Sequence, residues 1–166
     1  GSRGIWIGSN LHKCFRKIDS TVFEGAQLKI LIINGPNLNL LGVREPDVYG
    51  SETLSDIENW LNEQPETDGH SITWFQSNHE GEIIDQLHSA IKEVDGILIN
   101  PGAFTHYSYA IRDAVTAIGV PTVEVHLSNI HQREEFRKIS VLKDVCIGHF
   151  SGKGKNVYLE ALRLLI

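Results

Sequence analysis

The sequence predicts an α/β protein with a flavodoxin-like, doubly wound sheet of five parallel strands and helices on both faces. Short apolar runs alternate with segments of helical period from residue 28 to the end of the chain. The first run, residues 28–33, is interrupted only by Lys29, which is typical of a strand buried on both faces of a parallel sheet. A length of 166 residues suits one domain, and strands that alternate with helices favour right-handed crossovers.

The expected elements follow one another in a regular order. After the first strand and a polar loop, Thr53 and Asp56 have the spacing of a capping box, and Leu54, Ile57 and Leu61 continue with helical spacing. A helix is therefore expected at residues 54–61. The remaining elements, in order, are strand 71–76, helix 83–94, strand 96–99, helix 110–118, strand 121–127, a short charged helix at 133–139, strand 145–150 and a closing helix at 157–165.

Residues 1–27 differ from the rest of the chain because they begin with Gly-Ser and show no sustained period. We expect them to be a cloning-derived or weakly ordered extension. Their apolar stretch, residues 4–8, is too short for a signal peptide and is followed by polar residues. Residues 28–166 are expected to form a single catalytic domain.

Composition excludes several classes of partner. The 15 basic residues stand against 21 acidic ones, for a net charge of -6, so the broad basic surface that non-specific nucleic-acid or membrane-surface binding needs is not expected. No apolar run is long enough to span a membrane. The two cysteines, Cys14 and Cys146, are too few for a disulfide framework and indicate free thiols in a reducing compartment, so a cytoplasmic location is expected.

Polar residues gather where three of the predicted strands end. These segments are residues 34–39, 100–106 and 124–129. Each alone is compatible with ordinary turn chemistry. Because ligands bind at the carboxyl ends of the strands in open α/β sheets, three such segments on one edge predict a binding site.

The site is expected to work without a metal or a cofactor. The chain has no Gly-x-Gly-x-x-Gly fingerprint, no phosphate-binding Gly-x-x-x-x-Gly-Lys loop and no Gly-x-Ser-x-Gly elbow. His126 and His131 have no third metal ligand at a helical or hairpin spacing. The remaining histidines off the strand-end segments, His149 among them, are expected to be surface or structural residues.

His126 lies at the end of the fourth predicted strand, and Glu124 precedes it by two residues. Side chains two apart in a strand point to the same side of the sheet. A carboxylate in that position can select the tautomer of the imidazole and supply the cationic character that a general acid needs. The alternative is a structural histidine satisfied in the core.

Several motifs occur in one order along the chain: Asn34-Gly35-Pro36-Asn37-Leu38, Arg44-Glu45-Pro46, Tyr49-Gly50, Gln76-Ser77-Asn78, Asn100-Pro101-Gly102-Ala103, Thr105-His106, Arg112-Asp113, Glu124 to Asn129, and Arg133 to Arg137. With these motifs, residues 28–165 resemble the type II 3-dehydroquinate dehydratases. The resemblance implies a cofactor-free hydro-lyase that converts 3-dehydroquinate to 3-dehydroshikimate by trans-dehydration through an enolate. It also implies a place in the shikimate pathway of aromatic amino acid biosynthesis or in quinate breakdown.

The resemblance assigns the catalytic residues. It implies that Tyr49 is the base that removes the proton and that Arg44 is essential to it, since a tyrosine with an unperturbed pKa of about 10 needs a cation to stabilise its phenolate. His126 is implied as the general acid, held by Asn100, and Asn37 as the holder of a water at the enolate oxygen. Read without the resemblance, Tyr49 is an ordinary turn tyrosine.

Substrate binding and assembly follow from the same resemblance. The backbone N–H groups of Leu127 and Ser128 are expected to bind the substrate carboxylate, while His106 and Arg137 contact its hydroxyls. The family is a dodecamer built from trimers, in which an aspartate at the position of Asp113 reaches a neighbour's site. Arg137 also reads as part of a solvated charge run.

Two further expectations concern the mechanism. The loop at residues 38–50 is mostly polar or small, so we expect a mobile lid. A Schiff-base route is not expected, because the lysines from residue 29 onward all lie outside the strand-end segments. The competing interpretation is a flavodoxin-like module that binds a small anion without chemistry.

Overall fold

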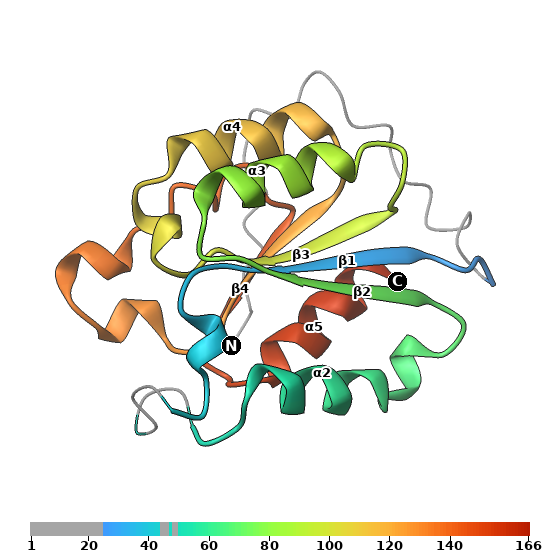
Figure 1. Ribbon diagram of the computed structural model, residues 1–166, viewed down its shortest axis with the longest axis horizontal. Coiled ribbons are helices and arrows are strands. Elements are labelled where there is room, and N and C mark those ends of the chain that lie inside the picture. Colours follow the sequence, from blue (N-terminus) through green and yellow to red (C-terminus); the bar gives the residue numbers. More distant parts are fainter. Residues whose placement is uncertain (1–24, 44–46, 48–49) are drawn as a thin grey trace, which may run out of the picture.

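The computed structural model describes residues 25–43, 47 and 50–166. Within them, five parallel strands form one sheet in the order β2-β1-β3-β4-β5 (Figure 1). This is the strand order of the flavodoxin-like doubly wound fold, so the predicted fold class is confirmed. The strands are β1 (Lys29–Asn34), β2 (Ser71–Gln76), β3 (Gly96–Asn100), β4 (Thr122–His126) and β5 (Gly148–Ser151).

Helices cover both faces of this sheet. Helices α3 and α4 lie on one face, and α2 and α5 lie on the other (Figure 1). The predicted capping box is present, with the Thr53 side chain accepting from the Asp56 N–H and the Asp56 carboxylate accepting from the Thr53 N–H. The helices are α2 (Leu54–Asn62), α3 (Glu80–Ser89), α4 (Tyr109–Ile118) and α5 (Asn156–Leu165).

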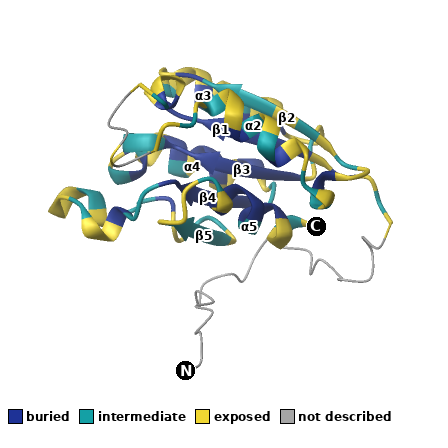
Figure 2. Cartoon of the chain, turned by 90° about the horizontal axis from the view of Figure 1, so that it is seen from below, coloured by how far each residue is buried: buried dark blue, intermediate teal, exposed yellow. Residues whose placement is uncertain are grey.

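The sheet separates two hydrophobic cores. Successive side chains of β1 alternate between them, with Ile30 and Ile32 facing α2 and α5, and Leu31 and Ile33 facing α3 and α4. Figure 2 shows the buried residues concentrated in the central strands between the more exposed helices. This burial on both faces explains why the first strand is an almost continuous apolar run.

Two predicted boundaries and one predicted helix are wrong. The second helix ends at Ser89 rather than residue 94, because Lys92 takes a left-handed φ of 62° and the chain turns there. The fifth strand begins at Gly148 rather than residue 145, since the amides of Val145 and Cys146 both donate to the carbonyl of Leu142. The short charged helix is a single 3-10 turn, Glu135–Lys138.

The loops after β1 and β3 touch at the carboxyl edge of the sheet. The Gly35 N–H donates to the Asn100 carbonyl at 2.7 Å, and a Cβ at Gly35 would lie 2.6 Å from the Pro101 carbonyl oxygen. Gly102 has a φ of 57°, and a Cβ there would lie 3.1 Å from the Pro36 carbonyl oxygen. Only glycine permits backbones to come this close, so the two glycines hold these loops together.

Some predictions lie outside the described residues. Arg44, Tyr49 and most of the predicted N-terminal extension are among them, as is Cys14. Cys146 is a free cysteine, and burial raises its pKa well above the ordinary value for a thiol. In the part of the chain that the structure describes, no helix has both the length and the apolar character needed to cross a membrane.

The contact at Gly35 generates a stability prediction. Gly35→Ala places a methyl group against a backbone carbonyl that cannot move without disturbing β3, so we expect a loss of roughly 1–3 kcal/mol in the free energy of unfolding. The measurement is urea denaturation at fixed protein concentration.

Gly81→Ala is the matched control. Gly81 lies inside α3, and an added Cβ meets nothing there. We expect no loss, or a gain of up to about 1 kcal/mol from helix propensity. Equal unfolding free energies for the two variants would contradict the role assigned to Gly35.

Candidate active site

A cavity of about 220 Å³ opens at the carboxyl ends of β1, β3 and β4. It lies where the strand order reverses between β1 and β3, the position at which doubly wound sheets bind ligands. Asn37 follows β1, Asn100 ends β3 and His126 ends β4, so three separate strands each present a polar side chain to the same space. The sheet topology therefore builds a site from segments far apart in the sequence.

Most of the predicted site residues meet in this cavity. Those that line it are Asn37, Asn100, His106, His126, Leu127, Ser128 and Arg137. Glu124 does not line it but lies directly behind His126. Asp113 is exposed on α4 and does not line the cavity, which is compatible with the expectation that it serves a neighbouring subunit.

His126 and Glu124 form a buried imidazole–carboxylate pair. The His126 Nε2 lies 2.7 Å from Glu124 Oε1, and the two side chains are 6% and 0% exposed. Burial by itself raises the pKa of Glu124, but the hydrogen bond and charge of His126 outweigh it and leave that pKa below its usual value. The carboxylate is thus ionised at neutral pH and can stabilise an imidazolium at His126.

Two hydroxyl groups also donate hydrogen bonds to this carboxylate. Ser140 donates to Glu124 at 2.8–2.9 Å, and Thr105 donates to Oε1 of the same carboxylate. The Ser140 oxygen also accepts the N–H groups of Leu142 and Lys143, which fixes the chain that carries it. Sequence reasoning missed Ser140, although a glutamate inside an apolar strand signals that buried donors must exist.

Asn37 has an unusual backbone conformation. Its φ of 67° is left-handed, and its N–H donates to Asn78 Oδ1 at 2.9 Å. Non-glycine residues adopt this region rarely, with asparagine the most tolerant, so the asparagine at this position follows from the turn as well as from any chemistry. This turn directs the chain along the rim of the cavity.

Asn100 is oriented by hydrogen bonds to α5 and to the loop that follows β3. Its Nδ2 donates to the buried Tyr158 hydroxyl at 3.4 Å, and its Oδ1 accepts from the Gly102 N–H at 3.3 Å. Tyr158 donates in turn to Asn34 Oδ1 at 2.5 Å, and burial raises the pKa of its phenol. The holding of His126 by Asn100 stays a prediction, since these bonds direct its amide to other partners.

The rest of the cavity favours an anionic ligand. Arg133 and Arg137 line it, and Arg137 pairs with Glu134 at 2.9 Å. His106 donates its Nδ1–H to the Ile139 carbonyl at 2.7 Å, and burial lowers its pKa, so it is neutral at neutral pH. Two guanidinium groups at the mouth attract a carboxylate, and the neutral imidazole of His106 can exchange hydrogen bonds with hydroxyls.

His149 was missed by the sequence analysis as a neighbour of the site. It lies on β5 directly opposite Glu124 in the β4–β5 register. Its Nε2 is 3.8 Å from Glu124 Oε2, and its ring centroid is 5.4 Å from that of His126. Nothing in the spacing of residues 124, 126 and 149 signals this cluster, because it depends on how β5 pairs with β4.

Fold and cavity together define a small doubly wound α/β protein with an acid–base pair at its strand ends. A model of the family described as "Dehydroquinase class II" matches residues 28–166. A 3-dehydroquinate dehydratase of Pelotomaculum thermopropionicum is 59% identical over 136 residues, which cover 82% of this chain and 94% of that protein. One of Clostridium beijerinckii is 55% identical over 139 residues, covering 83% and 95%.

Solved structures agree with these relatives. The type II dehydroquinase of Butyrivibrio crossotus superposes with a TM-score of 0.81 at 49% identity, covering 84% of this chain and 97% of that one. The type II dehydroquinase of Propionibacterium acnes gives a TM-score of 0.79 at 38% identity. The chain belongs to the class II dehydroquinase family, and the predicted resemblance is confirmed.

Removing the charge of Glu124 tests the acid–base pair. In Glu124→Gln the imidazolium of His126 loses its anionic partner, so we expect kcat to fall by about 10²-fold. KM should change little, because Glu124 does not line the cavity. Steady-state kinetics on the folded variant is the measurement.

Glu135→Gln is the control for this substitution. Glu135 is exposed on the 3-10 turn and forms a surface ion pair with Lys138 at 2.6 Å. We expect wild-type kinetics for it. A raised KM with unchanged kcat in Glu124→Gln would show that this carboxylate acts in binding instead.

Proposed function

We propose that this chain is a cofactor-free lyase that dehydrates 3-dehydroquinate to 3-dehydroshikimate. Membership of the class II dehydroquinase family supports the substrate and the reaction. The observation that carries the proposal is the His126–Glu124 pair, whose imidazole faces a cavity lined by arginines. A lone anion-binding module has no need for a buried, charge-stabilised acid at that position.

The reaction is the loss of water β to a ketone. A base removes a proton α to the carbonyl, the electron pair moves into an enolate, and the C–O bond then breaks as the leaving hydroxyl takes a proton. We assign that last proton to His126, because its ring lines the cavity and Glu124 stabilises its charged form. The proton that His126 donates leaves with the hydroxyl as the product water.

Tyr49 and Arg44 are proposed as the base and its activating cation. A phenol becomes an effective base near neutral pH only when a nearby positive charge stabilises the phenolate. The support is the Arg44 to Tyr49 motif and its place in the chain, since Leu41, three residues before Arg44, lines the cavity. Asn37, on the cavity rim, is proposed to hold the water that stabilises the enolate oxygen.

The substrate is proposed to bind through its carboxylate and hydroxyls. The backbone N–H groups of Leu127 and Ser128 would take the carboxylate, and His106 and Arg137 the ring hydroxyls, since all four residues line the cavity. Closure of the segment at residues 38–50 is proposed to exclude water, which strengthens every charge interaction inside.

Turnover of 3-dehydroquinate followed by NMR tests the function. We expect the purified protein to form 3-dehydroshikimate and His126→Ala to lose about 10²- to 10⁴-fold in kcat while keeping its fold. Tyr49→Phe should abolish turnover and leave substrate binding, measured by calorimetry, largely intact. A folded wild-type protein that binds the substrate without converting it would instead be the anion-binding module.

The quaternary structure is part of the proposal. Four large side chains near the 3-10 turns Gly102–His106 and Glu135–Lys138 are 57–66% exposed: Tyr107, Tyr109, Phe136 and Ile139. Exposed aromatic and aliphatic side chains of this size mark an association surface. A trimer-based dodecamer covers such a surface and lets Asp113 reach a neighbouring site.

Light scattering measures this assembly. We expect a mass well above the 18.6 kDa of one chain, in multiples of three chains. Tyr109→Glu, which places a charge at the most exposed of these four side chains, should reduce that mass. An active 18.6 kDa monomer would contradict the assembly.

The proposed location of the protein is the cytoplasm, and its proposed role lies in aromatic biosynthesis or quinate breakdown.

A further inference from the structure

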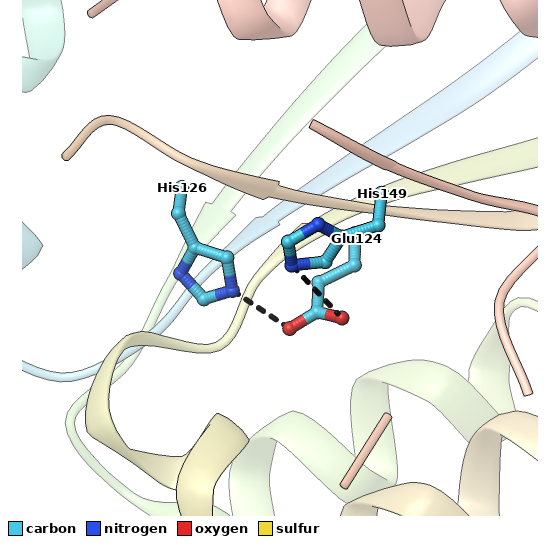
Figure 3. Close-up of side chains that lie close together, drawn as sticks. All are labelled: Glu124, His126 and His149. Atoms are coloured by element: carbon cyan, nitrogen blue, oxygen red, sulfur yellow. Dashed lines mark hydrogen bonds and ion pairs between the residues drawn. The ribbon is translucent and has the colours of Figure 1, made fainter. Parts of the chain in front are cut away.

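Three side chains that can ligate a metal ion, the proposed acid among them, converge beside the cavity. Glu124 and His126 come from β4 and His149 comes from β5, and Figure 3 shows both imidazole rings beside the carboxylate. One ligand atom from each residue lies within 4.8 Å of the other two. The pairing of Glu124 with His149 in the β4–β5 register makes this a feature of the sheet itself.

The third member of the cluster is unsatisfied. His149 Nε2 is buried and has no hydrogen-bond partner, and its side chain is only 11% exposed. A buried polar nitrogen without a partner costs free energy, so this atom gains from any group that binds it. Burial also lowers the pKa of His149, which keeps the imidazole neutral, the form in which it ligates metals.

We propose that Glu124, His126 and His149 form an inhibitory site for a divalent transition-metal ion such as Zn²⁺. Two imidazoles and one carboxylate, with a fourth position for water, are a ligand set that suits zinc and cobalt. Magnesium and calcium prefer oxygen ligands and are not expected to bind here. The expectation of no catalytic metal is unchanged, since this ion would oppose the reaction.

The present geometry needs small shifts to hold the ion. Bonds of about 2.0–2.1 Å in a tetrahedron place neighbouring ligand atoms about 3.3 Å apart. The 2.7 Å between His126 Nε2 and Glu124 Oε1 must open by about half an ångström. His149 Nε2, which is 3.8 Å from the other carboxylate oxygen, must move toward the ion, because the ligand atoms are spread over as much as 4.8 Å. Thr105 and Ser140 would remain as donors that orient the ligating carboxylate.

A bound metal ion would inhibit the reaction because it would displace the proton that His126 shares with Glu124. The ion takes the place of the proton between His126 Nε2 and Glu124, and that proton passes to solvent. A metal-bound imidazole cannot also carry two protons, so His126 no longer donates one readily. Of the three ligands only His126 lines the cavity, and the proposed contacts to the substrate carboxylate and hydroxyls come from other residues, so the loss falls on kcat rather than KM.

Cobalt binding tests the site without any enzyme assay. We expect one Co²⁺ per chain with the visible absorption of a low-coordinate nitrogen and oxygen site, displaced by Zn²⁺. His149→Gln should weaken binding by at least about 10- to 100-fold, the loss that even an outer-shell partner causes. His131→Gln is the matched control, because its ring is 6.5 Å from that of His149 but it offers no ligand to the cluster.

Zinc inhibition is the second readout, and it rests on the proposed function. Zn²⁺ should abolish turnover in the wild type and in His131→Gln, with recovery on adding EDTA, whereas His149→Gln should resist it. His12 and Cys14 are present in every variant, so they cannot produce the difference. The basal turnover of His149→Gln should match the wild type, since His149 does not line the cavity.

Two results would overturn the proposal. One is Co²⁺ absorption that is absent or unchanged in His149→Gln, and the other is equal zinc inhibition of all three proteins. His149-dependent cobalt binding in a protein that never converts 3-dehydroquinate would contradict the proposed function and still support the metal site.

Discussion

The carboxylate of Glu124 is fully buried near the carboxyl end of β4, and hydrogen bonds from three segments satisfy it. A buried charge without partners costs several kcal/mol, so the chain must bring donors to it. Ser140, Thr105 and His126 do this from three different segments. The chain after β4 therefore has to fold back over the strand ends, and in doing so it places Arg133 and Arg137 at the cavity.

The need to satisfy the buried Glu124 carboxylate also determines the electrostatic environment of His126. Because the hydroxyls of Thr105 and Ser140 also hold the carboxylate, its position does not depend on the imidazole alone, and it offers His126 a charge that is little screened by water. Preorganisation of this kind lowers the cost of moving charge during a reaction. The proposed acid therefore already has its anionic partner in this structure.

A second buried network joins the closing helix to the strand ends. Tyr158 of α5 bonds Asn34 at the end of β1 and Asn100 at the end of β3, although 124 and 58 residues separate the partners in sequence. The cavity is thereby connected to the hydrophobic core beneath it. The Asn34 Nδ2 remains without a partner among the described residues, so this network is not fully satisfied.

The Glu124 carboxylate also explains why the proposed metal site and the proposed acid share the same residues. Both need an ionised carboxylate that is shielded from water and an imidazole with one ring nitrogen directed at it. That nitrogen carries a proton in the acid and would bind the ion in the metal site. In this chain β5 adds a histidine where the register faces Glu124. The residue proposed to make His126 an acid is then also the residue that would let an ion replace its proton.

The sequence by itself determined the fold class, the strand order and most of the cavity. These depend on local patterns: the near-continuous apolar strands, the Thr53–Asp56 capping box, and the polar segments that follow β1, β3 and β4. Only the tertiary structure decided the partners of Glu124, since Ser140 lies 16 residues away and His149 reaches it by strand register. The ends of α3 and β5 were also decided there, because backbone turns at Lys92 and Leu142 compete with the periodic pattern. Periodicity reports which face of an element is buried, whereas contacts between distant segments depend on how those elements pack.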